Sequence, residues 1–208
     1  MILLCSNGPA ALSLMPEVLK KPPKEISLLY VPTAGKGARD QGFLERCTKA
    51  IVRSGYTFKE FDIEGKSERD IDAALDDHDA VYVEGGNTFY LLKAIRESGF
   101  KKAVHRFLDR GKLYVAPSAG AKVVCPTIET STWKKRGEEK PRFGVTNLTA
   151  MNLVPFLVVC HYTSEKESET KAGIASTNLP VRILQDGQAL LVRDGNVKFL
   201  GEGEEVRL

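Results

Sequence analysis

The chain has 208 residues, of which 42% are hydrophobic and 27% are charged, and this balance suits one compact domain with a full core. Its net charge of +3 comes from dispersed lysines and arginines, which argues against nucleic acid as the main partner. No apolar run is long enough to cross a bilayer, and the N-terminus lacks the basic residues of a signal peptide. We therefore expect a cytoplasmic protein with a single domain over residues 1–208 and no membrane partner.

Strand-like and helix-like runs alternate along the first part of the chain. Residues typical of strands lie at 2–6, 26–34, 56–63, 80–86 and 112–118. Helical spacing, capping residues and terminal glycines predict helices at 39–55, 67–79, 87–99 and 100–111. Continuous apolar strands between amphipathic helices predict an α/β fold with a mostly parallel sheet covered on both faces.

The pattern changes after residue 125. The run at 156–162 is typical of a further buried strand. From residue 181 onward, Asp-Gly turns at 186–187 and 194–195 separate alternating runs, which predicts a C-terminal antiparallel β meander. The segment 132–144 is either a lid or a disordered loop, and its charged residues are interpreted as a solvated loop.

A serine follows one of the buried strands directly, in the stretch "YVAPSAGAKV". Ser118 is flanked by small residues much as in the G-x-S-x-G nucleophile elbow, with Ala116 in place of the first glycine. A helix starting there would present free N–H groups to a developing oxyanion. A serine in this position is also a common helix cap, so both interpretations stay open at this point.

Two glycines and an asparagine follow the preceding strand. Adjacent glycines allow a backbone to approach a ligand closely, so Gly86 N–H is a candidate oxyanion donor. The alternative is a tight turn formed by Gly85 and Gly86, with Asn87 capping the next helix. The spacing matches neither of the glycine-rich motifs that bind phosphate groups.

One of the three histidines lies at a strand end. His161 follows the run at 156–160 and is the one plausible base for Ser118, whereas His78 and His105 lie in charged surroundings and are expected to be solvated. The four cysteines form no C-x-x-C pair, which argues against zinc. We therefore expect no zinc site.

Several of these stretches together resemble the S51 serine peptidases, the group of dipeptidase E and cyanophycinase. The stretches are "GGNTFYLL" at 85–92, "SAGAKVVCPTI" at 118–128, "NLVPFLVVCHYT" at 152–163 and "SET" at 168–170. Their order and spacing extend the resemblance over nearly the whole chain. It implies a flavodoxin-like three-layer sandwich, related to class I glutamine amidotransferases, with serine in place of their cysteine.

The resemblance also implies roles for particular residues. Ser118 would be the nucleophile and His161 the general base, and the backbone N–H groups of Gly86 and Ala119 would form the oxyanion hole. The implied reaction is hydrolysis of a dipeptide or small peptide after an N-terminal aspartate, with neither a metal nor an organic cofactor. The implied substrate-binding residues are Gly85, Asn87, Thr163 and Lys171.

The chain departs from the family pattern at three positions. Trp133 stands where the family has an aspartate, so Asp186 or Glu129 would have to orient the base. Lys171 stands where an arginine is thought to grip the substrate, and lysine lacks the bidentate fork of arginine. Pro117 replaces an aromatic residue. These departures leave aspartyl specificity open.

We therefore expect a serine-type peptidase that acts on dipeptides or small peptides, including those with an acidic N-terminal residue. The alternative is a catalytically weak or inactive relative that binds a small amino-acid-like ligand. A glutamine amidotransferase would need a cysteine at the elbow, where this chain has Ser118, and Cys125 lies too far along. A monomer and a homodimer are both compatible with the sequence.

Overall fold

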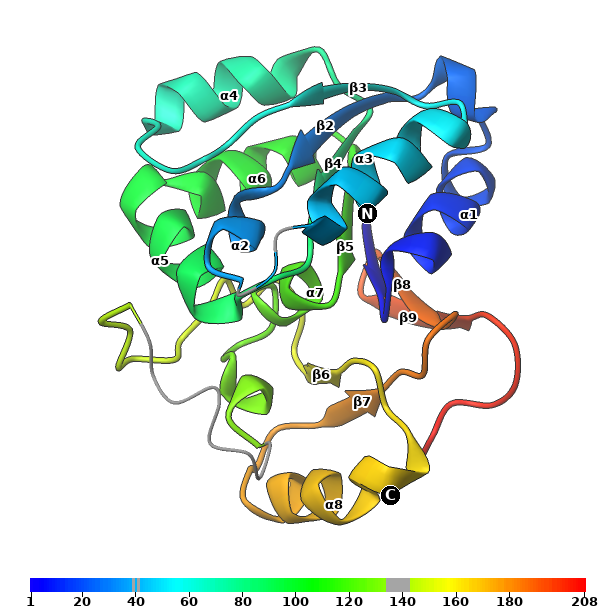
Figure 1. Ribbon diagram of the computed structural model, residues 1–208, viewed down its shortest axis with the longest axis vertical. Coiled ribbons are helices and arrows are strands. Elements are labelled where there is room, and N and C mark those ends of the chain that lie inside the picture. The colour runs from blue at the N-terminus through cyan, green and yellow to red at the C-terminus, as the bar shows by residue number, and fades with distance from the viewer. Residues whose placement is uncertain (39, 41, 134–142) are drawn as a thin grey trace.

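The computed structural model describes residues 1–38, 40, 42–133 and 143–208, so most of the segment considered as a lid, 134–142, lies outside the described residues. In the described part, the main sheet has the strand order β3-β2-β4-β5-β1-β8-β9 (Figure 1). Its strands are β1 (Ile2–Cys5), β2 (Ser27–Val31), β3 (Thr57–Glu60), β4 (Ala80–Val83), β5 (Leu113–Pro117), β8 (Ala189–Arg193) and β9 (Asn196–Leu200). Strands β1 to β5 pair in parallel, whereas β8 and β9 are antiparallel, as predicted.

Helices cover both faces of this sheet and make it the middle of three layers (Figure 1). One face is covered by α1 (Gly8–Leu19) and α3 (Gly42–Arg53). The other is covered by α4 (Glu68–Asp76), α5 (Thr88–Ser98), α6 (Phe100–Asp109) and the short α7 (Ala119–Lys122). Neighbouring residues of β1 alternate between the layers, with Leu3 packing against the α1 face and Leu4 against the other. Burial on both faces explains why these strands are continuously apolar.

The last two strands form the predicted hairpin. Asp194 and Gly195 both have positive φ, 51° and 77°, as a two-residue type I′ turn requires. The earlier Asp-Gly turn differs from the prediction of a continuous meander. The strand before it, β7 (Val181–Ile183), pairs in parallel with β6 (Leu157–Val159) in a separate small sheet, where Ile183 becomes buried. The turn at 186–187 therefore joins two sheets.

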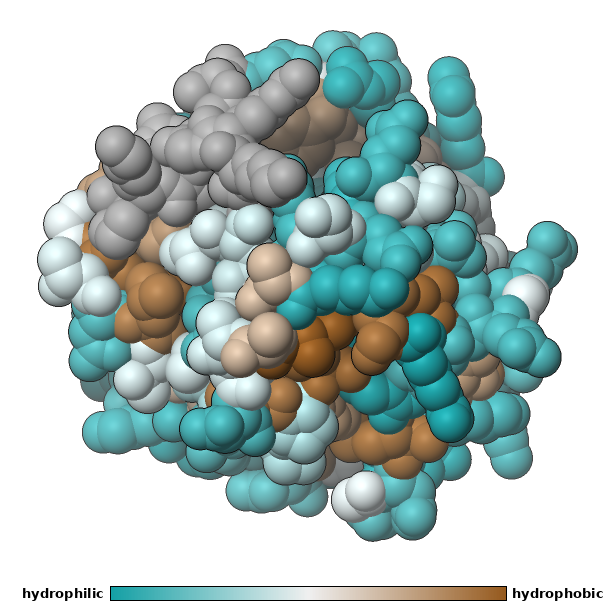
Figure 2. Space-filling view, turned by 90° about the horizontal axis from the view of Figure 1, so that it is seen from below, coloured by the Kyte–Doolittle hydropathy of each residue, from teal (hydrophilic) through white to brown (hydrophobic). Residues whose placement is uncertain are grey.

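The small sheet lies below the main one in Figure 1, together with α8 (Glu167–Ala175). The 3-10 turns η2 (Glu129–Ser131) and η3 (Ser164–Lys166) precede β6 and α8 respectively, and η1 (Pro23–Glu25) precedes β2. Figure 2 shows this lower face, where apolar side chains lie between hydrophilic ones. The small sheet and α8, which come from the second half of the chain, therefore cover the edge of the main sheet at which β4 and β5 end.

Helices α1, α2 (Thr33–Lys36) and α8 of the described chain fall outside the predicted helices. Helix α1 contains Pro9 in its first turn, where proline is tolerated, and Pro16 in its interior, and Asn7 caps it by accepting a hydrogen bond from Ala10 N. The run predicted as a strand to residue 34 ends at Val31 and continues into α2. No helix in the described ranges has the length and apolar character to span a membrane.

Candidate active site

Ser118 occupies a strained corner between β5 and α7. Its backbone has φ 51° and ψ −109°, a conformation that non-glycine residues rarely adopt and that is often retained at functional sites. The turn is tight enough that a Cβ at Gly120 would lie 2.2 Å from the carbonyl oxygen of Val83, so only glycine fits there. Although Ser118 stands at the N-cap of α7, its side chain makes no capping hydrogen bond. Its hydroxyl is instead directed to a histidine.

His161 lies between Ser118 and a carboxylate. Its Nε2 is 3.0 Å from Ser118 Oγ, and its Nδ1 is 2.7 Å from Asp186 Oδ1. The histidine follows β6 with φ 57°, and its carbonyl accepts a hydrogen bond from the Lys166 ammonium group. The three side chains therefore form an unbroken hydrogen-bonded chain from carboxylate to hydroxyl.

The hydroxyl of Ser6 forms hydrogen bonds with both Asp186 and His161. Ser6, at the end of β1, donates a hydrogen bond to Asp186 Oδ1 at 2.8 Å and accepts one from His161 N at 2.8 Å. Ser6 is fully buried, whereas His161 is half-buried and Asp186 is exposed, so the two bonds are shielded from water on the Ser6 side. Nothing in the local sequence around Ser6 singled it out.

The two candidate carboxylates have different surroundings. Asp186 contacts the imidazole ring, whereas the Glu129 carboxylate accepts a hydrogen bond from Thr127 Oγ1 at 2.8 Å. Asp186 is brought to His161 by the turn that links β7 to β8. Trp133, at the position of the family aspartate, lines the adjoining cavity.

The environment shifts the pKa values of both His161 and Asp186. Burial lowers the pKa of His161 below its ordinary value of 6.5, although Asp186 raises it by its charge and its hydrogen bond. Burial raises the pKa of Asp186, but the hydrogen bonds and charge that Ser6 and His161 supply bring it below 3.8 overall. Near neutral pH the pair therefore consists of a neutral imidazole and an ionised carboxylate, the state that a general base requires.

The glycine loop after β4 lies beside the serine. Gly86 has φ 142°, and a Cβ there would lie 2.5 Å from the carbonyl oxygen of Ala34, so both the conformation and the space require glycine. A Cβ on Gly85 would lie 3.3 Å from Ser118 Cβ. Ala119 follows the serine directly and is the first residue of α7. The backbone N–H groups of Gly86 and Ala119 thus belong to the two segments that meet at Ser118.

A buried glutamate that was not among the predicted site residues supports this loop. Glu84 Oε1 accepts a hydrogen bond from Gly85 N at 2.7 Å, and its Oε2 accepts one from the Tyr30 hydroxyl at 3.2 Å. Burial raises the pKa of Glu84 above 4.5, although these hydrogen bonds lower it. Its position directly after β4 was the available signal, because a charged residue is rare inside a fully buried run.

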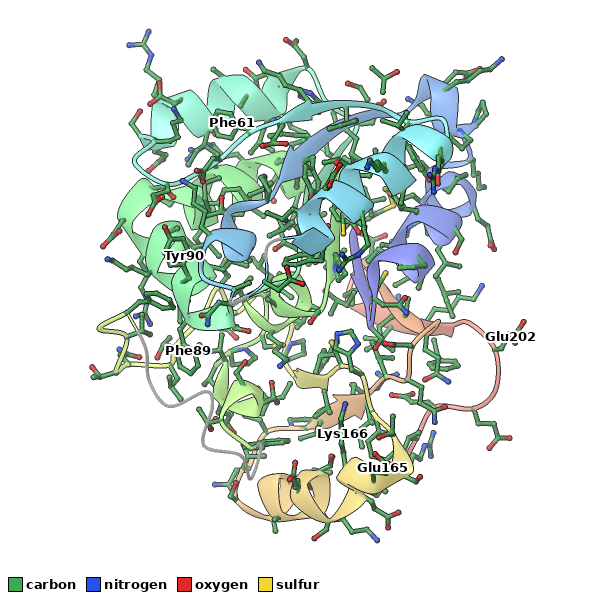
Figure 3. All side chains as sticks on the ribbon, viewed as in Figure 1. Phe61, Phe89, Tyr90, Glu165, Lys166 and Glu202 are labelled. Atoms are coloured by element: carbon green, nitrogen blue, oxygen red, sulfur yellow. The ribbon has the colours of Figure 1, made fainter. Side chains whose placement is uncertain are left out.

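A cavity of about 140 Å³ opens beside Ser118. Its lining consists of Gly86, Thr88, Ser118, Lys122, Thr130, Trp133, Val159, Cys160, His161, Lys166, Glu169 and Thr170. Lys166 lies at the start of α8, in the lower part of the molecule in Figure 3. The cavity thus combines Ser118 and His161 with two lysines and one carboxylate, and none of these three charged residues was predicted as a site residue.

Three residues predicted to bind substrate have other surroundings. Asn87 accepts a hydrogen bond from Tyr90 N at 3.0 Å and caps α5, which is the alternative considered for it. Lys171 is exposed on α8 and pairs with Glu167 at 2.6 Å. Thr163 is exposed and precedes η3. None of the three is among the residues that line the cavity in the described part of the chain.

The other two histidines lie in different settings. His105 is exposed on α6, as expected. The prediction that His78 is solvated is wrong, because His78 is buried and its Nδ1 lies 2.8 Å from the carbonyl oxygen of Ala74. Within the described ranges, no three side chains of histidine, cysteine, aspartate and glutamate come together in a group that could hold a metal ion.

Comparisons with known proteins agree on one family. The model of "Peptidase family S51" matches residues 2–200. An uncharacterised peptidase of Pasteurella multocida is 31% identical over 171 residues, covering 81% of this chain and 82% of the relative. Peptidase E of a Nostoc species is 27% identical over 184 residues, covering 84% of this chain and 72% of the relative.

Two solved structures share the fold. A crystal structure of a candidate peptidase E protein from Listeria monocytogenes superposes with a TM-score of 0.83 at 26% identity, covering 97% of this chain and 98% of that one. A peptidase from an acI-B1 actinobacterium superposes with a TM-score of 0.69 at 15% identity, covering 97% and 87% respectively, and shows the fold alone.

Proposed function

The chain belongs to peptidase family S51, and from this premise we propose that it is a serine peptidase that hydrolyses dipeptides or small peptides. The observation that carries the proposal is the continuous contact from Asp186 through His161 to Ser118, at 2.7 Å and 3.0 Å. This is the arrangement by which a carboxylate orients an imidazole, and the imidazole activates a hydroxyl.

In the proposed reaction, Ser118 Oγ attacks the peptide carbonyl while His161 Nε2 takes its proton. The backbone N–H groups of Gly86 and Ala119 stabilise the negative charge that develops on the carbonyl oxygen. His161 then gives the proton to the leaving amine, and an ester remains on Ser118. His161 then takes a proton from a water molecule that attacks this ester, and gives it to Ser118 Oγ as the bond between this oxygen and the acyl carbon breaks, which releases the acid product and restores the serine. Asp186 stabilises the imidazolium that forms in each half of the reaction.

The charges around the cavity support a preference for peptides with an acidic N-terminal residue. Lys122, Lys166 and Glu169 all line it. A lysine ammonium group can pair with a side-chain carboxylate, and a glutamate can pair with a free amino terminus. We propose that these residues, rather than the exposed Lys171, contact the charged groups of the substrate.

The proposal is tested by comparing the wild-type protein with Ser118→Ala on a panel of Asp-X, Glu-X and uncharged dipeptides. We expect the substitution to reduce kcat by several orders of magnitude, about 10⁴-fold or more. The control is Ser13→Ala, which removes an exposed hydroxyl on α1 that bonds only the carbonyl of Ala10 among the described contacts. Equal turnover by the wild type and Ser118→Ala would overturn the assignment of the nucleophile.

A second readout is independent of the choice of peptide. A fluorophosphonate probe reacts with an activated serine, so we expect one label per chain at Ser118 and none in Ser118→Ala. Absence of labelling in the wild-type protein would instead favour a relative that binds a small amino-acid-like ligand without hydrolysing it.

A further inference from the structure

Trp133 forms part of the cavity beside Ser118 and rests on a glycine of α8. A Cβ built on Gly173 would lie 2.1 Å from Trp133 Cδ2 and 2.3 Å from its Cε3, so the indole lies directly against the helix backbone. Any larger residue at position 173 would displace the ring. The contact therefore sets where the indole stands relative to the cavity.

Trp133 is half-buried and lines the cavity together with buried residues. Thr130 and Thr170 line the same cavity and are 7% and 4% exposed. Thr170 Oγ1 donates a hydrogen bond to the Lys166 carbonyl at 2.8 Å, which joins the start of α8 to its middle. The indole also packs against the main hydrophobic core. The contacts with Gly173 and with the core hold the buried side of the indole, so the ring forms one wall of the cavity.

The cavity is small, about 140 Å³, and Trp133 is the largest side chain in its lining. We propose that Trp133 determines specificity by size: its indole, held against Gly173, excludes peptides with a bulky N-terminal side chain from the cavity beside Ser118. This inference rests on the proposed function, because it assigns the cavity to the residue whose carbonyl Ser118 attacks.

The chain carries its own reporter for this site, since Trp133 is its one tryptophan. The first experiment titrates Ala-Ala, Asp-Ala, Leu-Ala and Phe-Ala into the Ser118→Ala protein, which keeps dipeptides intact, and follows tryptophan emission. We expect a saturable change with Ala-Ala and Asp-Ala and no saturation with Phe-Ala over the same concentrations. Equal affinity for Phe-Ala and Ala-Ala would overturn the proposal.

The second experiment enlarges the cavity. Trp133→Ala is expected to raise the ratio of kcat/KM for Phe-Ala to kcat/KM for Ala-Ala by about tenfold or more. A change of this order is what one methylene group more or less in a substrate pocket produces in the discrimination between substrates. Trp133→Phe should give an intermediate ratio and serves where the alanine variant does not fold. The matched control is Phe143→Ala, which removes an exposed aromatic ring that packs on Tyr90 outside the cavity lining.

The outcomes separate this inference from the proposed function. The wild type could hydrolyse peptides while the ratio of kcat/KM for Phe-Ala to kcat/KM for Ala-Ala stays unchanged in both Trp133→Ala and Trp133→Phe. That result would refute size exclusion by Trp133 and leave the serine mechanism standing. If no peptide is hydrolysed, calorimetric titration of the same dipeptides into wild type and Trp133→Ala decides the matter. Size exclusion by Trp133 is supported if Trp133→Ala binds Phe-Ala tightly and the wild type does not. It is refuted if the two proteins bind the dipeptides identically.

Discussion

Ser6 and Asp186 are joined by a 2.8 Å hydrogen bond although 180 positions separate them along the chain. The same Ser6 hydroxyl accepts the backbone N–H of His161 at 2.8 Å. One buried side chain at the end of β1 therefore holds both the carboxylate and the backbone of the histidine. It fixes the distance between two residues that follow the parallel strands of the small sheet, His161 after β6 and Asp186 after β7.

Removing this hydroxyl is expected to loosen the arrangement. Ser6→Ala leaves the His161 N–H without its partner, which should lower the free energy of unfolding by about 1–3 kcal/mol. A misplacement of about 1 Å at a reacting group costs up to about 10²-fold in rate, so we expect a lower kcat with little change in KM. Urea denaturation and steady-state kinetics measure the two effects. A Ser6→Ala protein with wild-type kcat would contradict this positioning role.

Asp186→Asn tests which carboxylate orients the base. The amide is nearly the same shape but cannot stabilise an imidazolium, and we expect kcat to fall by about 10⁴-fold, as in the trypsin-type triad. Glu129→Gln is the matched control, since Glu129 bonds Thr127 and not the imidazole. The assay is kcat for both variants on the best dipeptide of the panel. A larger loss in Glu129→Gln than in Asp186→Asn would reverse the assignment.

The pH dependence of the reaction reports on the ionisation of His161. Only the neutral imidazole accepts the Ser118 proton, and burial holds the pKa of His161 below 6.5. Activity should therefore persist to weakly acidic pH, and the acidic limb of kcat/KM should lie below pH 6.5. Asp186 raises this pKa, so the limb of the residual activity in Asp186→Asn should move to still lower pH. Profiles of both proteins from about pH 4 to pH 8 decide this, and a limb above the ordinary histidine value would contradict it.

Features encoded by neighbouring residues could be predicted from the sequence. The apolar strands, the helices with terminal glycines and the turn at Asp194–Gly195 depend on local spacing and backbone preference. Ser118 and Gly86 stood out because small residues surround a strand end. Their proximity followed from parallel pairing, which brings the carboxyl ends of neighbouring strands to one edge.

Features that depend on contacts between distant segments could not be predicted in this way. The pairing of β7 with β6 turned the expected hairpin at Asp186 into a link between two sheets, and that link is what carries the carboxylate to His161. Ser6 and Lys166 belong to segments without a motif. Trp133 was noted for the aspartate it replaces, whereas its contact with Gly173 is visible only in three dimensions.

Gly86, in the loop after β4, has no room for a side chain. In Gly86→Ala the new methyl group would lie 2.5 Å from the carbonyl oxygen of Ala34, and φ 142° is unfavourable for alanine. The control is Gly111→Ala, where φ is 76° but no atom lies within 4 Å, so it carries the conformational cost without the collision. We expect Gly86→Ala to be less stable than Gly111→Ala by about 1–3 kcal/mol, the usual cost of overpacking.

Activity should separate the two variants further. A displaced Gly86 N–H removes one oxyanion donor, which costs on the order of 10²–10³ in kcat, whereas Gly111 lies between α6 and β5, away from the cavity lining. Denaturation curves and kcat for both variants provide the comparison. If Gly86→Ala kept the kcat of Gly111→Ala while folding normally, the loop after β4 would supply no hydrogen bond to the oxyanion, and Ala119 N–H would have to act without it.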